Sequence, residues 1–347
     1  MADNVIGSFP TRLPTNVSSM TLSSHHDTEI LILGAGMAGL SAATELQRAG
    51  RRVLMLDKGR SVGGRMATRR LGEAVFDHGA QFITARSARF HATLGGMVEN
   101  GAVVEWCRGF AETADGHPRW RGHPGMTAVP GLLAKSVAVR LEKQIASLSV
   151  MASGWLARTK DGETFTAGAL LLTPPVPQSL ALLDVGGFEL IKPMRSRLEA
   201  IEYERCLAVL AVLDGPSQIP SPGGRQFTEG PIAWLADNQL KGISPQPAVT
   251  IHASHAFSVE HWEGDRRASG RELLLAAAPW LGAAVKEFQV HAWRYSKPLL
   301  VEQCACLLAN EAPPLIFAGD AFAGSKVEGA ALSGWAAAEL LKRWKKE

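Results

Sequence analysis

"EILILGAGMAGLSAATELQRAGRRVLMLDKG", residues 29–59, decides the fold of this chain. The apolar run Glu29–Leu33 ends at a glycine and predicts a buried parallel strand. Met37–Ala49 has helical spacing and ends at Gly50, which predicts a helix with a glycine C-cap. Arg52–Leu56 is a second apolar run of strand length. Strand, helix and strand form a βαβ unit, so the local sheet is predicted to be parallel.

Three glycines join the first strand to the helix, in the pattern Gly34-x-Gly36-x-x-Gly39. The first permits a tight turn, the second lets the backbone approach a pyrophosphate, and the third lets helix and strand pack closely. Free N–H groups and the helix dipole then face the phosphates. Asp57 ends the next strand, where its carboxylate can accept hydrogen bonds from ribose hydroxyls and repels a 2′-phosphate. The unit predicts FAD or NAD binding through Gly34, Ala35, Gly36, Met37, Ala38, Gly39, Asp57 and Lys58.

Gly63-Gly64-Arg65 follows a few residues after this acid. Two glycines let the backbone lie against a bulky ligand, and Arg65 can make a charge-assisted contact with a phosphate. Flavoproteins of the amine oxidase superfamily carry such an element, and the chain resembles them here. The alternative is a glycine turn beside a solvated arginine.

"FDHGAQF", residues 76–82, is the next motif. Its Gly-Ala pair offers a close backbone approach beside a planar ring, and Asp77 and His78 can orient one another. A structural hydrogen-bonding role explains His78 equally well. From this motif we predict FAD contacts at Gly79, Ala80, Gln81 and Phe82.

"FAGDAFAGSKVEGAALSGWAAAELL", residues 317–341, lies near the other end of the chain. The predicted strand Leu315–Ala318 delivers Asp320, which can bond to a polyol such as ribityl. The predicted helix Glu328–Lys345 then points its N-terminal dipole at the pyrimidine end of a flavin. A plain βα unit is the alternative, but the early and late motifs together favour FAD. The predicted contacts here are Gly319, Asp320, Val327, Glu328 and Ala330.

The middle of the chain has a different character, with further strands and helices. Their predicted bounds are Ala128–Arg140 (helix), Leu148–Thr173 (meander with a hairpin at Lys160-Asp161-Gly162, ending in a short buried strand Ala169–Leu172), Leu207–Leu213 and Val249–Ala253 (strands) and Gly270–Ala278 (helix).

We therefore predict an α/β fold of two domains, a Rossmann-like FAD-binding domain and a mixed-sheet substrate domain. The first and last thirds share nucleotide chemistry, so the chain leaves one domain and later returns to it. This arrangement is a common way to build a cleft between two domains. The predicted limits are residues 28–95, 125–175 and 290–347 for the FAD-binding domain, 96–124 and 176–289 for the substrate domain, and 1–27 for a disordered extension.

The composition excludes several other classes of protein. A net charge of +3 in 347 residues gives no support for nucleic-acid binding. No apolar run reaches the roughly 20 residues that span a bilayer, and residues 1–27 lack an apolar secretory core. The four cysteines complete no metal site and read as reduced thiols, which predicts a cytoplasmic protein without a metal.

Seven motifs in this order resemble the renalase family, especially its bacterial members, from about residue 29 to the end: "GAGMAGLSAA", "DKGRSVGGRMATRR", "FDHGAQFITARS", "LLTPPVPQSLALL", "IHASHAFSVEHW", "HAWRYSKP" and "GDAFAGSKVEGAALSG". The resemblance implies a p-hydroxybenzoate-hydroxylase-like fold with non-covalent FAD. It also implies a second, pyridine dinucleotide as substrate. Isomers of NAD(P)H reduced at the 2- or 6-position of the nicotinamide are oxidised to NAD(P)+, and dioxygen is reduced to hydrogen peroxide.

The resemblance also indicates residues of the substrate pocket. His252 matches the family's "HA(S/T)" histidine and can bond to a carboxamide or ribose, although a structural role is the alternative. On the strand around Arg294, one face should line the pocket, and we favour Trp293 and Tyr295. Trp234 and Asn238 match a family stretch whose basic turn differs in this chain.

Two other functions stay open from the residues. A flavin amine oxidase or desaturase acting on another small substrate is one, although nothing in the sequence shows that the two tyrosines, Tyr203 and Tyr295, pair beside a flavin. A flavin-binding protein without turnover is the other. Neither Cys304 nor Cys306 has the context of a covalent flavin attachment, so dissociable FAD is expected.

Overall fold

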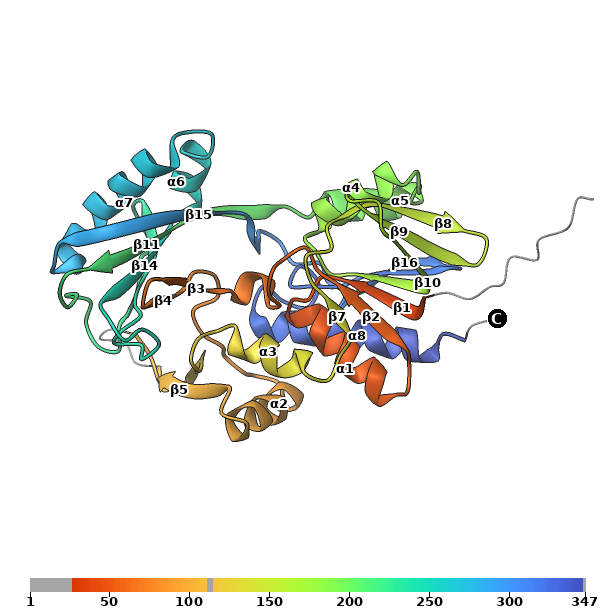
Figure 1. Cartoon of the computed structure of the whole chain (residues 1–347), viewed down its shortest axis with the longest axis horizontal. Coiled ribbons are helices and arrows are strands. Elements are labelled where there is room, and N and C mark those ends of the chain that lie inside the picture. The colour runs from red at the N-terminus through yellow and green to blue at the C-terminus, as the bar shows by residue number, and fades with distance from the viewer. Residues whose placement is uncertain (1–26, 111–114, 346–347) are drawn as a thin grey trace, which may run out of the picture.

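Two sheets of unequal size organise the chain, with the larger one at the right of Figure 1 and the smaller one at the left. The structure is a computed structural model that describes residues 27–110 and 115–345. The extension predicted over residues 1–27 lies outside the described residues except for Asp27.

The larger sheet has eight strands, and its main path runs β16-β17-β10-β1-β2-β7. The predicted βαβ unit is confirmed, because Ile30 pairs with Val53 in a parallel ladder. β17 and β7 extend the parallel part, whereas β16, β9 and β8 are antiparallel to their neighbours. The strands are β1 (Thr28–Leu33), β2 (Val53–Leu56), β7 (Val139–Arg140), β8 (Ile145–Met151), β9 (Gly154–Thr159), β10 (Thr164–Leu172), β16 (Leu307–Glu311) and β17 (Pro314–Phe317).

Both faces of this sheet are covered, which explains why β1 reads as a continuous apolar run. Ile30 and Ile32 pack toward α1 and α8, whereas Leu31 and Leu33 pack toward α4, α5 and the β8–β9 hairpin. The helices involved are α1 (Met37–Arg48), α3 (Ala128–Ala134), α4 (Val176–Val185), α5 (Lys192–Glu199) and α8 (Val327–Arg343).

Two predicted elements differ in the structure. The helix expected over Ala128–Arg140 ends at Ala134, and its last residues form the edge strand β7. Pairing with β2 explains this, because the Met55 and Asp57 amides donate to carbonyls of residues 138 and 140. The short strand expected at Ala169–Leu172 is the buried end of the nine-residue strand β10.

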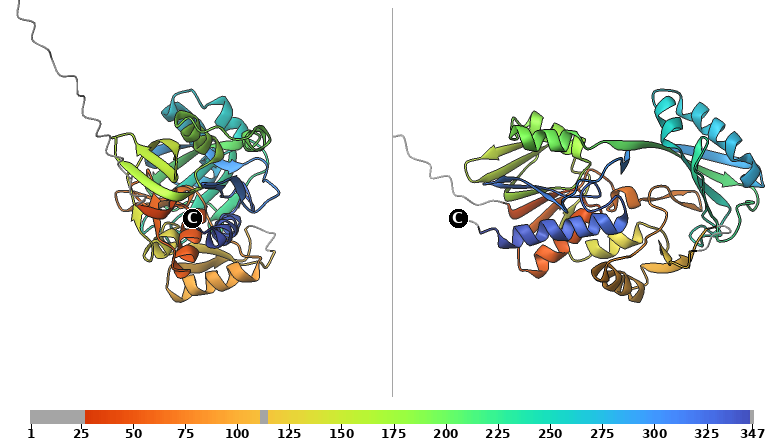
Figure 2. Two further views of the ribbon diagram at one scale, coloured as in Figure 1. Left: turned by 90° about the vertical axis from the view of Figure 1, so that its right-hand side faces the viewer. Right: turned by 180° about the vertical axis from the view of Figure 1, so that it is seen from behind.

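The smaller sheet is antiparallel throughout, with the order β12-β13-β14-β11-β15. One face packs on the helices α6 and α7, and the other faces the larger sheet's part of the molecule (Figure 2). The elements are β11 (Tyr203–Leu213), β12 (Gly224–Gln226), β13 (Ile232–Asp237), β14 (Ala248–Ala253), β15 (Val285–Pro298), α6 (His255–Glu260) and α7 (Arg266–Leu281).

Smaller elements connect the two parts. The hairpin β3–β4 packs Phe76 against Leu210 and Ala248 of the smaller sheet. The remaining elements are η1 (Gly64–Met66), β3 (Thr68–Leu71), β4 (Ala74–Asp77), α2 (Ala88–Glu99), β5 (Val103–Cys107) and β6 (Arg119–Gly122).

We propose that each domain consists of one sheet and the elements packed on it, which moves two of the limits predicted from the sequence. The helices α4 and α5, residues 176–199, pack on the larger sheet, and β15 stays in the smaller sheet until Pro298. Over residues 27–110 and 115–345, no helix combines the length and apolar character needed to cross a membrane. All four cysteines are free thiols.

Candidate active site

The turn before α1 has the geometry that its three glycines predict. Gly34 has a φ of +95°, a region that favours glycine. A Cβ on Gly39 would lie 2.1 Å from the Gly34 carbonyl oxygen, so strand and helix can meet only without it. A Cβ on Gly36 would meet no protein atom within 4 Å, and no side chain caps the helix there. The N-terminal N–H groups of α1 thus border open space that a phosphate can fill.

Asp57 lies beside this turn, at the end of β2. Its two carboxylate oxygens accept hydrogen bonds from the Ala35 and Gly59 amides at 2.7 and 2.6 Å. Each oxygen keeps a lone pair that can accept a bond from a ribose hydroxyl. Lys58 points elsewhere, since its ammonium donates to Gln178 at 3.3 Å, and its contact with FAD stays a prediction.

Arg65 and Asp320 form a bidentate ion pair, with distances of 2.6 and 2.7 Å. Burial disfavours the charged form of Arg65, but the Asp320 carboxylate more than offsets this and raises the pKa of Arg65 above its ordinary value. We expected Arg65 to contact a phosphate and Asp320 a ribityl chain. Both contacts stay predictions, and the ion pair joins the early and late motifs directly through these two side chains.

The loop after β4 lies against the Gly63-Gly64-Arg65 turn. The Ala80 amide donates to the Arg65 carbonyl at 2.8 Å, and a Cβ on Gly79 would lie 2.0 Å from that oxygen. The Gln81 amide nitrogen donates to the carbonyls of Asp77 and Gly79. Phe82 leaves the loop toward an aromatic cluster, which also contains Trp106, Phe110 and Trp234.

The N-terminus of α8 carries no side-chain cap, so it too offers free N–H groups. The Glu328 carboxylate accepts bonds from the Arg86 and Ser87 amides, and these bonds outweigh burial and hold its pKa below the ordinary value. Its side chain therefore ties α8 to the start of α2. A Cβ on Gly334 would lie 2.1 Å from the Ala38 carbonyl oxygen, so α8 and α1 are in close backbone contact.

The inner face of the smaller sheet carries one cross-strand row. Trp234 pairs with His252, His252 with Ala208, and Ala208 with His291. The small side chain of Ala208 stands between two imidazoles. Trp293 follows His291 on the same face of β15, as the alternation predicts.

His78 lies on this row and connects it to the loop after β4. The His252 Nε2–H and the Trp293 Nε1–H both donate to the His78 carbonyl, at 3.1 and 2.8 Å. Because a carbonyl only accepts, His252 carries its proton on Nε2 and presents Nδ1 as an acceptor. The His78 ring stacks on Trp293 with centroids 5.1 Å apart. Its Nδ1 is buried and has no hydrogen-bond partner among residues 27–110 and 115–345.

All three imidazoles are neutral near pH 7. Burial is the largest cause for each, and it lowers the pKa of His78 to about 3. Burial likewise lowers the pKa of both His252 and His291 to about 4, and the charge of Arg69 adds to the effect at His291. The row is therefore uncharged.

Tyr295 and Tyr203 do form a pair. Their ring centroids are 5.5 Å apart and the planes make an angle of 81°. The Tyr203 hydroxyl oxygen accepts a bond from the Val176 amide at 3.3 Å, and burial raises the pKa of Tyr203. The structure thus brings His252 and Trp293 together, whereas Tyr295 packs in a separate pair.

Two residues singled out in the sequence are structural. Asn238 donates to the Ala248 carbonyl and the Thr250 hydroxyl, which fixes the turn after β13. Asp77 does not orient the His78 ring as expected; its carboxylate accepts from Lys241, Thr68 and Met126 instead.

Sequence reasoning missed His291 and Lys241. His291 was predictable, because it precedes Trp293 by two residues on a predicted strand and so shares its face. Lys241 was not, because a lysine in a polar turn normally reads as solvated, whereas this one is fully buried.

These observations fit a large dinucleotide. Two uncapped helix N-termini, the space beside Gly36 and the His78 Nδ1 atom, which has no partner in the described part of the chain, are available to it. Fold and site define a class of two-domain proteins that bind a dinucleotide at a Rossmann-type βαβ unit.

Comparison with protein families identifies the chain further. Residues 32–94 match the NAD(P)-binding Rossmann-like domain, and residues 102–342 match the family of flavin containing amine oxidoreductases. The chain belongs to the flavin-containing amine oxidoreductase family. The predicted fold class is confirmed, and the protein is an FAD-dependent oxidoreductase with FAD as its cofactor.

Individual relatives match over short stretches only. Protein anon-37Cs of Drosophila lebanonensis is 34% identical over 79 residues, which are 22% of this chain and 14% of that protein. The putative flavin-containing monoamine oxidase AofH of Mycobacterium tuberculosis is 44% identical over 55 residues, or 16% of this chain and 12% of that protein.

Similar solved structures cover nearly the whole chain. A putative protoporphyrinogen oxidase from Exiguobacterium sp. 255-15 has a TM-score of 0.67 at 14% identity and covers 91% of this chain and 99% of that one. Wild-type putrescine oxidase bound to putrescine has a TM-score of 0.68 at 14% identity and covers 90% and 98%. At this identity the likeness is one of fold.

Proposed function

We propose that the protein is an oxidase of the renalase type. It oxidises the 2- and 6-dihydro isomers of NAD(P)H to NAD(P)+ and reduces dioxygen to hydrogen peroxide. Each turnover consumes one dihydronicotinamide, one dioxygen and one proton, and it releases one NAD(P)+ and one hydrogen peroxide. The observation that carries this proposal is the uncharged row of rings on the inner face of the smaller sheet.

A dihydronicotinamide is an electron-rich hydride donor, so its oxidation needs position more than acid–base catalysis. The imidazoles of His78, His252 and His291 have pKa values of about 3, 4 and 4, and they remain neutral through the physiological range. The stack of His78 on Trp293 offers a planar surface for a planar ring. The His252 Nδ1 acceptor suits the N–H of a carboxamide.

FAD, when bound, supplies the hydride acceptor and the site of reaction with dioxygen. We propose that the N-terminus of α1 and Asp57 hold its pyrophosphate and ribose. The loop after β4 and the N-terminus of α8 would lie against its ring system. The Arg65–Asp320 pair joins η1, which contacts the loop after β4, to the segment between β17 and α8.

A flavin amine oxidase is the second candidate, because of the family and the tyrosine pair. In a T-shaped pair with centroids 5.5 Å apart, however, the edge of one ring contacts the face of the other. Such a pair leaves no gap for an alkyl chain between the rings. This geometry favours a planar substrate over an alkylamine.

Anaerobic rapid mixing of the holoenzyme with a panel of donors tests the proposal. We expect the 2- and 6-dihydro isomers to bleach the visible flavin band rapidly, with NAD(P)+ as product. Ordinary 4-dihydro-NADH is the matched control, because it has the same mass and charge and should react far more slowly. Bleaching by alkylamines but not by the isomers would establish the second candidate, and bleaching by none would indicate binding without turnover.

We also propose that FAD is held without a covalent bond. Cys304 and Cys306 pack on opposite faces of the larger sheet, and burial raises the pKa of both thiols. Acid precipitation of the holoenzyme should therefore release all flavin into the supernatant. Yellow colour retained in the washed pellet would contradict a dissociable cofactor.

A further inference from the structure

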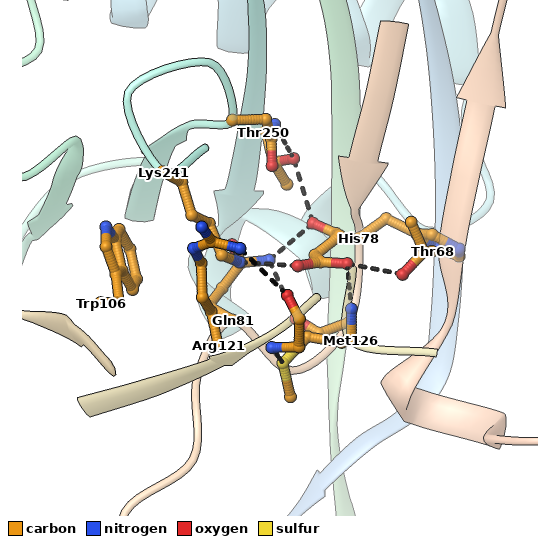
Figure 3. A network of polar contacts seen from close by, with 12 residues as sticks. Thr68, His78, Gln81, Trp106, Arg121, Met126, Lys241 and Thr250 are labelled. Atoms are coloured by element: carbon orange, nitrogen blue, oxygen red, sulfur yellow. Dashed lines mark hydrogen bonds and ion pairs between the residues drawn. The ribbon is translucent and has the colours of Figure 1, made fainter. Parts of the chain in front are cut away.

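A fully buried ion pair lies behind the loop after β4. The Lys241 ammonium is 2.8 Å from an Asp77 carboxylate oxygen, and both side chains have an exposed fraction of 0%. The other carboxylate oxygen accepts bonds from the Thr68 hydroxyl and the Met126 amide. The pair joins the turn after β13 in the smaller sheet to the end of β4. Figure 3 shows Lys241 with the labelled residues around it.

Burying this ion pair costs desolvation free energy. Desolvation lowers the pKa of Lys241, and Asp77 opposes that effect, while the neighbouring Arg121 adds a second positive charge. Replacing buried ion pairs with apolar residues is often neutral or stabilising. Stability alone therefore does not explain why a lysine occupies this position.

The contacts of Lys241 lead on to the loop. Its ammonium lies 3.5 Å from the Gln81 side-chain oxygen. That contact fixes which end of the Gln81 amide is oxygen, so the nitrogen end donates to the carbonyls of Asp77 and Gly79 at 2.7 and 3.1 Å. The Thr250 hydroxyl of β14 also donates to the Asp77 carbonyl, at 3.1 Å.

We propose that Lys241 is a positioning residue for FAD. Acting through Asp77 and Gln81, it holds the Gly79 carbonyl and the adjoining peptide in the one orientation that lets the loop lie against the flavin ring. Lys241 touches neither cofactor nor substrate. The inference rests on the proposed place of the loop beside FAD, and it is independent of which donor is oxidised.

The loop around Gly79 depends on the Lys241 ammonium for the orientation of the Gln81 side chain. The Gly79 peptide is already confined, because the Arg65 carbonyl allows no Cβ at that position. Without the ammonium, the Gln81 amide can rotate and release the Gly79 carbonyl. The loop then loses one of its links to the smaller sheet, while the bonds from Thr250, His252 and Trp293 to the carbonyls of Asp77 and His78 remain.

A double-mutant cycle with Lys241→Met and Gln81→Leu tests the relay, with visible circular dichroism of bound FAD and the FAD dissociation constant as readouts. Each single variant should change the dichroism band and weaken FAD binding about tenfold, as loss of one buried hydrogen bond predicts. The double variant should bind FAD no more weakly than the single variant with the lower affinity. Additive effects, or wild-type dichroism in Lys241→Met, would overturn the proposal.

Arg51→Met is the matched control. Arg51 is a partly buried cation that pairs with Glu29 at 2.8 Å and donates to the Leu341 carbonyl. Leu341 lies near the C-terminal end of α8, whereas the proposed FAD contact is at its N-terminus. This variant should lower the melting temperature and leave the dichroism and affinity of FAD unchanged. If it changed both as much as Lys241→Met does, a general loss of order would replace the positioning role.

A second variant covers failure of Lys241→Met to fold. Asp77→Asn combined with Lys241→Met removes both charges together and leaves no uncompensated ion in the interior. We expect a folded protein with the same altered dichroism. Wild-type dichroism and affinity in this double variant would show that the pair does not position FAD. None of these measurements needs a donor, so they stand apart from the test of turnover.

Discussion

At Gly36, a single methyl group separates two properties of the molecule. A Cβ there meets no protein atom within 4 Å, so Gly36→Ala should keep the thermal stability of the cofactor-free protein. The methyl group enters the space that we assign to the pyrophosphate, and FAD affinity should fall about a hundredfold, the scale of losing charge-assisted bonds. Titration by flavin fluorescence measures the affinity.

Gly131→Ala is the control for that substitution, because its Cβ also meets no atom within 4 Å and lies in α3. It should leave the affinity for FAD unchanged and raise stability by about 0.5–1 kcal/mol, because alanine favours a helix more than glycine does. Equal FAD affinity in Gly36→Ala and the wild type would remove the turn from the cofactor site.

His252 is the residue at which position and catalysis can be separated. His252→Ala removes one of two N–H donors to the His78 carbonyl, and Trp293 remains as the other. We expect FAD to stay bound and flavin reduction by a dihydro isomer to slow about tenfold, the scale of one hydrogen bond. Anaerobic stopped-flow measures the rate. His261→Ala removes a ring stacked on Phe257 in α6, and the flavin of this variant should be reduced at the wild-type rate.

Single residues were predictable from the sequence where a pattern constrained them. The glycines before α1 and the alternating residues of β15 lie as predicted, because turn geometry and strand pleating are local. The Arg65–Asp320 and Lys241–Asp77 pairs were not predictable. Each joins residues more than 150 positions apart, and only the tertiary fold brings them within hydrogen-bond distance.

At the scale of elements, the loop after β4 meets the strands β14 and β15 through three imidazoles with lowered pKa values. His78 has a pKa of about 3, and His252 and His291 of about 4, against an ordinary value of 6.5. Between these values the unfolded chain binds more protons than the folded one, so stability rises with pH. The contribution is complete above pH 6.5 and is lost as the pH falls from there toward 4.

Thermal melts from pH 7.5 to 5 measure this dependence. The melting temperature should fall as the solution is acidified below about pH 6.5, where free imidazole begins to take up protons. The melting temperature of His252→Gln should fall less steeply with acidification, because this variant lacks one of the three imidazoles. Identical slopes in variant and wild type would contradict the lowered pKa of His252.

The two elements that differed from prediction share a cause. The end of α3 and the start of β10 contain apolar residues whose spacing fits more than one structure. Pairing decided both cases, because β2 and β9 offered free backbone groups to residues 139–140 and 164–167. The strand β1 and the helix α1 were predictable because their pattern and their termini agreed.

At the scale of the whole molecule, the two ends of the described chain meet around one site. The helices α1 and α8 touch through Ala38 and Gly334, and their N-termini lie at the same edge of the larger sheet. A ligand bound between them holds the chain closed. FAD at a hundredfold excess over its dissociation constant should add about 2.7 kcal/mol to the free energy of unfolding.

Differential scanning fluorimetry with and without FAD measures that effect. For a chain of this size, the melting temperature should rise by roughly 2–4 °C. At the same FAD concentration, a hundredfold weaker affinity leaves Gly36→Ala with only about 0.4 kcal/mol of stabilisation, so its melting temperature should rise by less than about 1 °C. A cofactor-dependent rise in that variant equal to the wild type would mean that FAD binds elsewhere.

The antiparallel pair β11–β15 has a mechanical consequence. It pairs from Tyr203 opposite Pro298 to Leu213 opposite Val285, and it spans the distance between the two parts of the molecule. Such a ladder acts as a beam, and bending it would break several hydrogen bonds at once. We therefore expect the ladder to resist a wide separation of the two parts of the molecule. We expect a dinucleotide to enter by local motions of the surrounding loops, with the β11–β15 ladder kept intact.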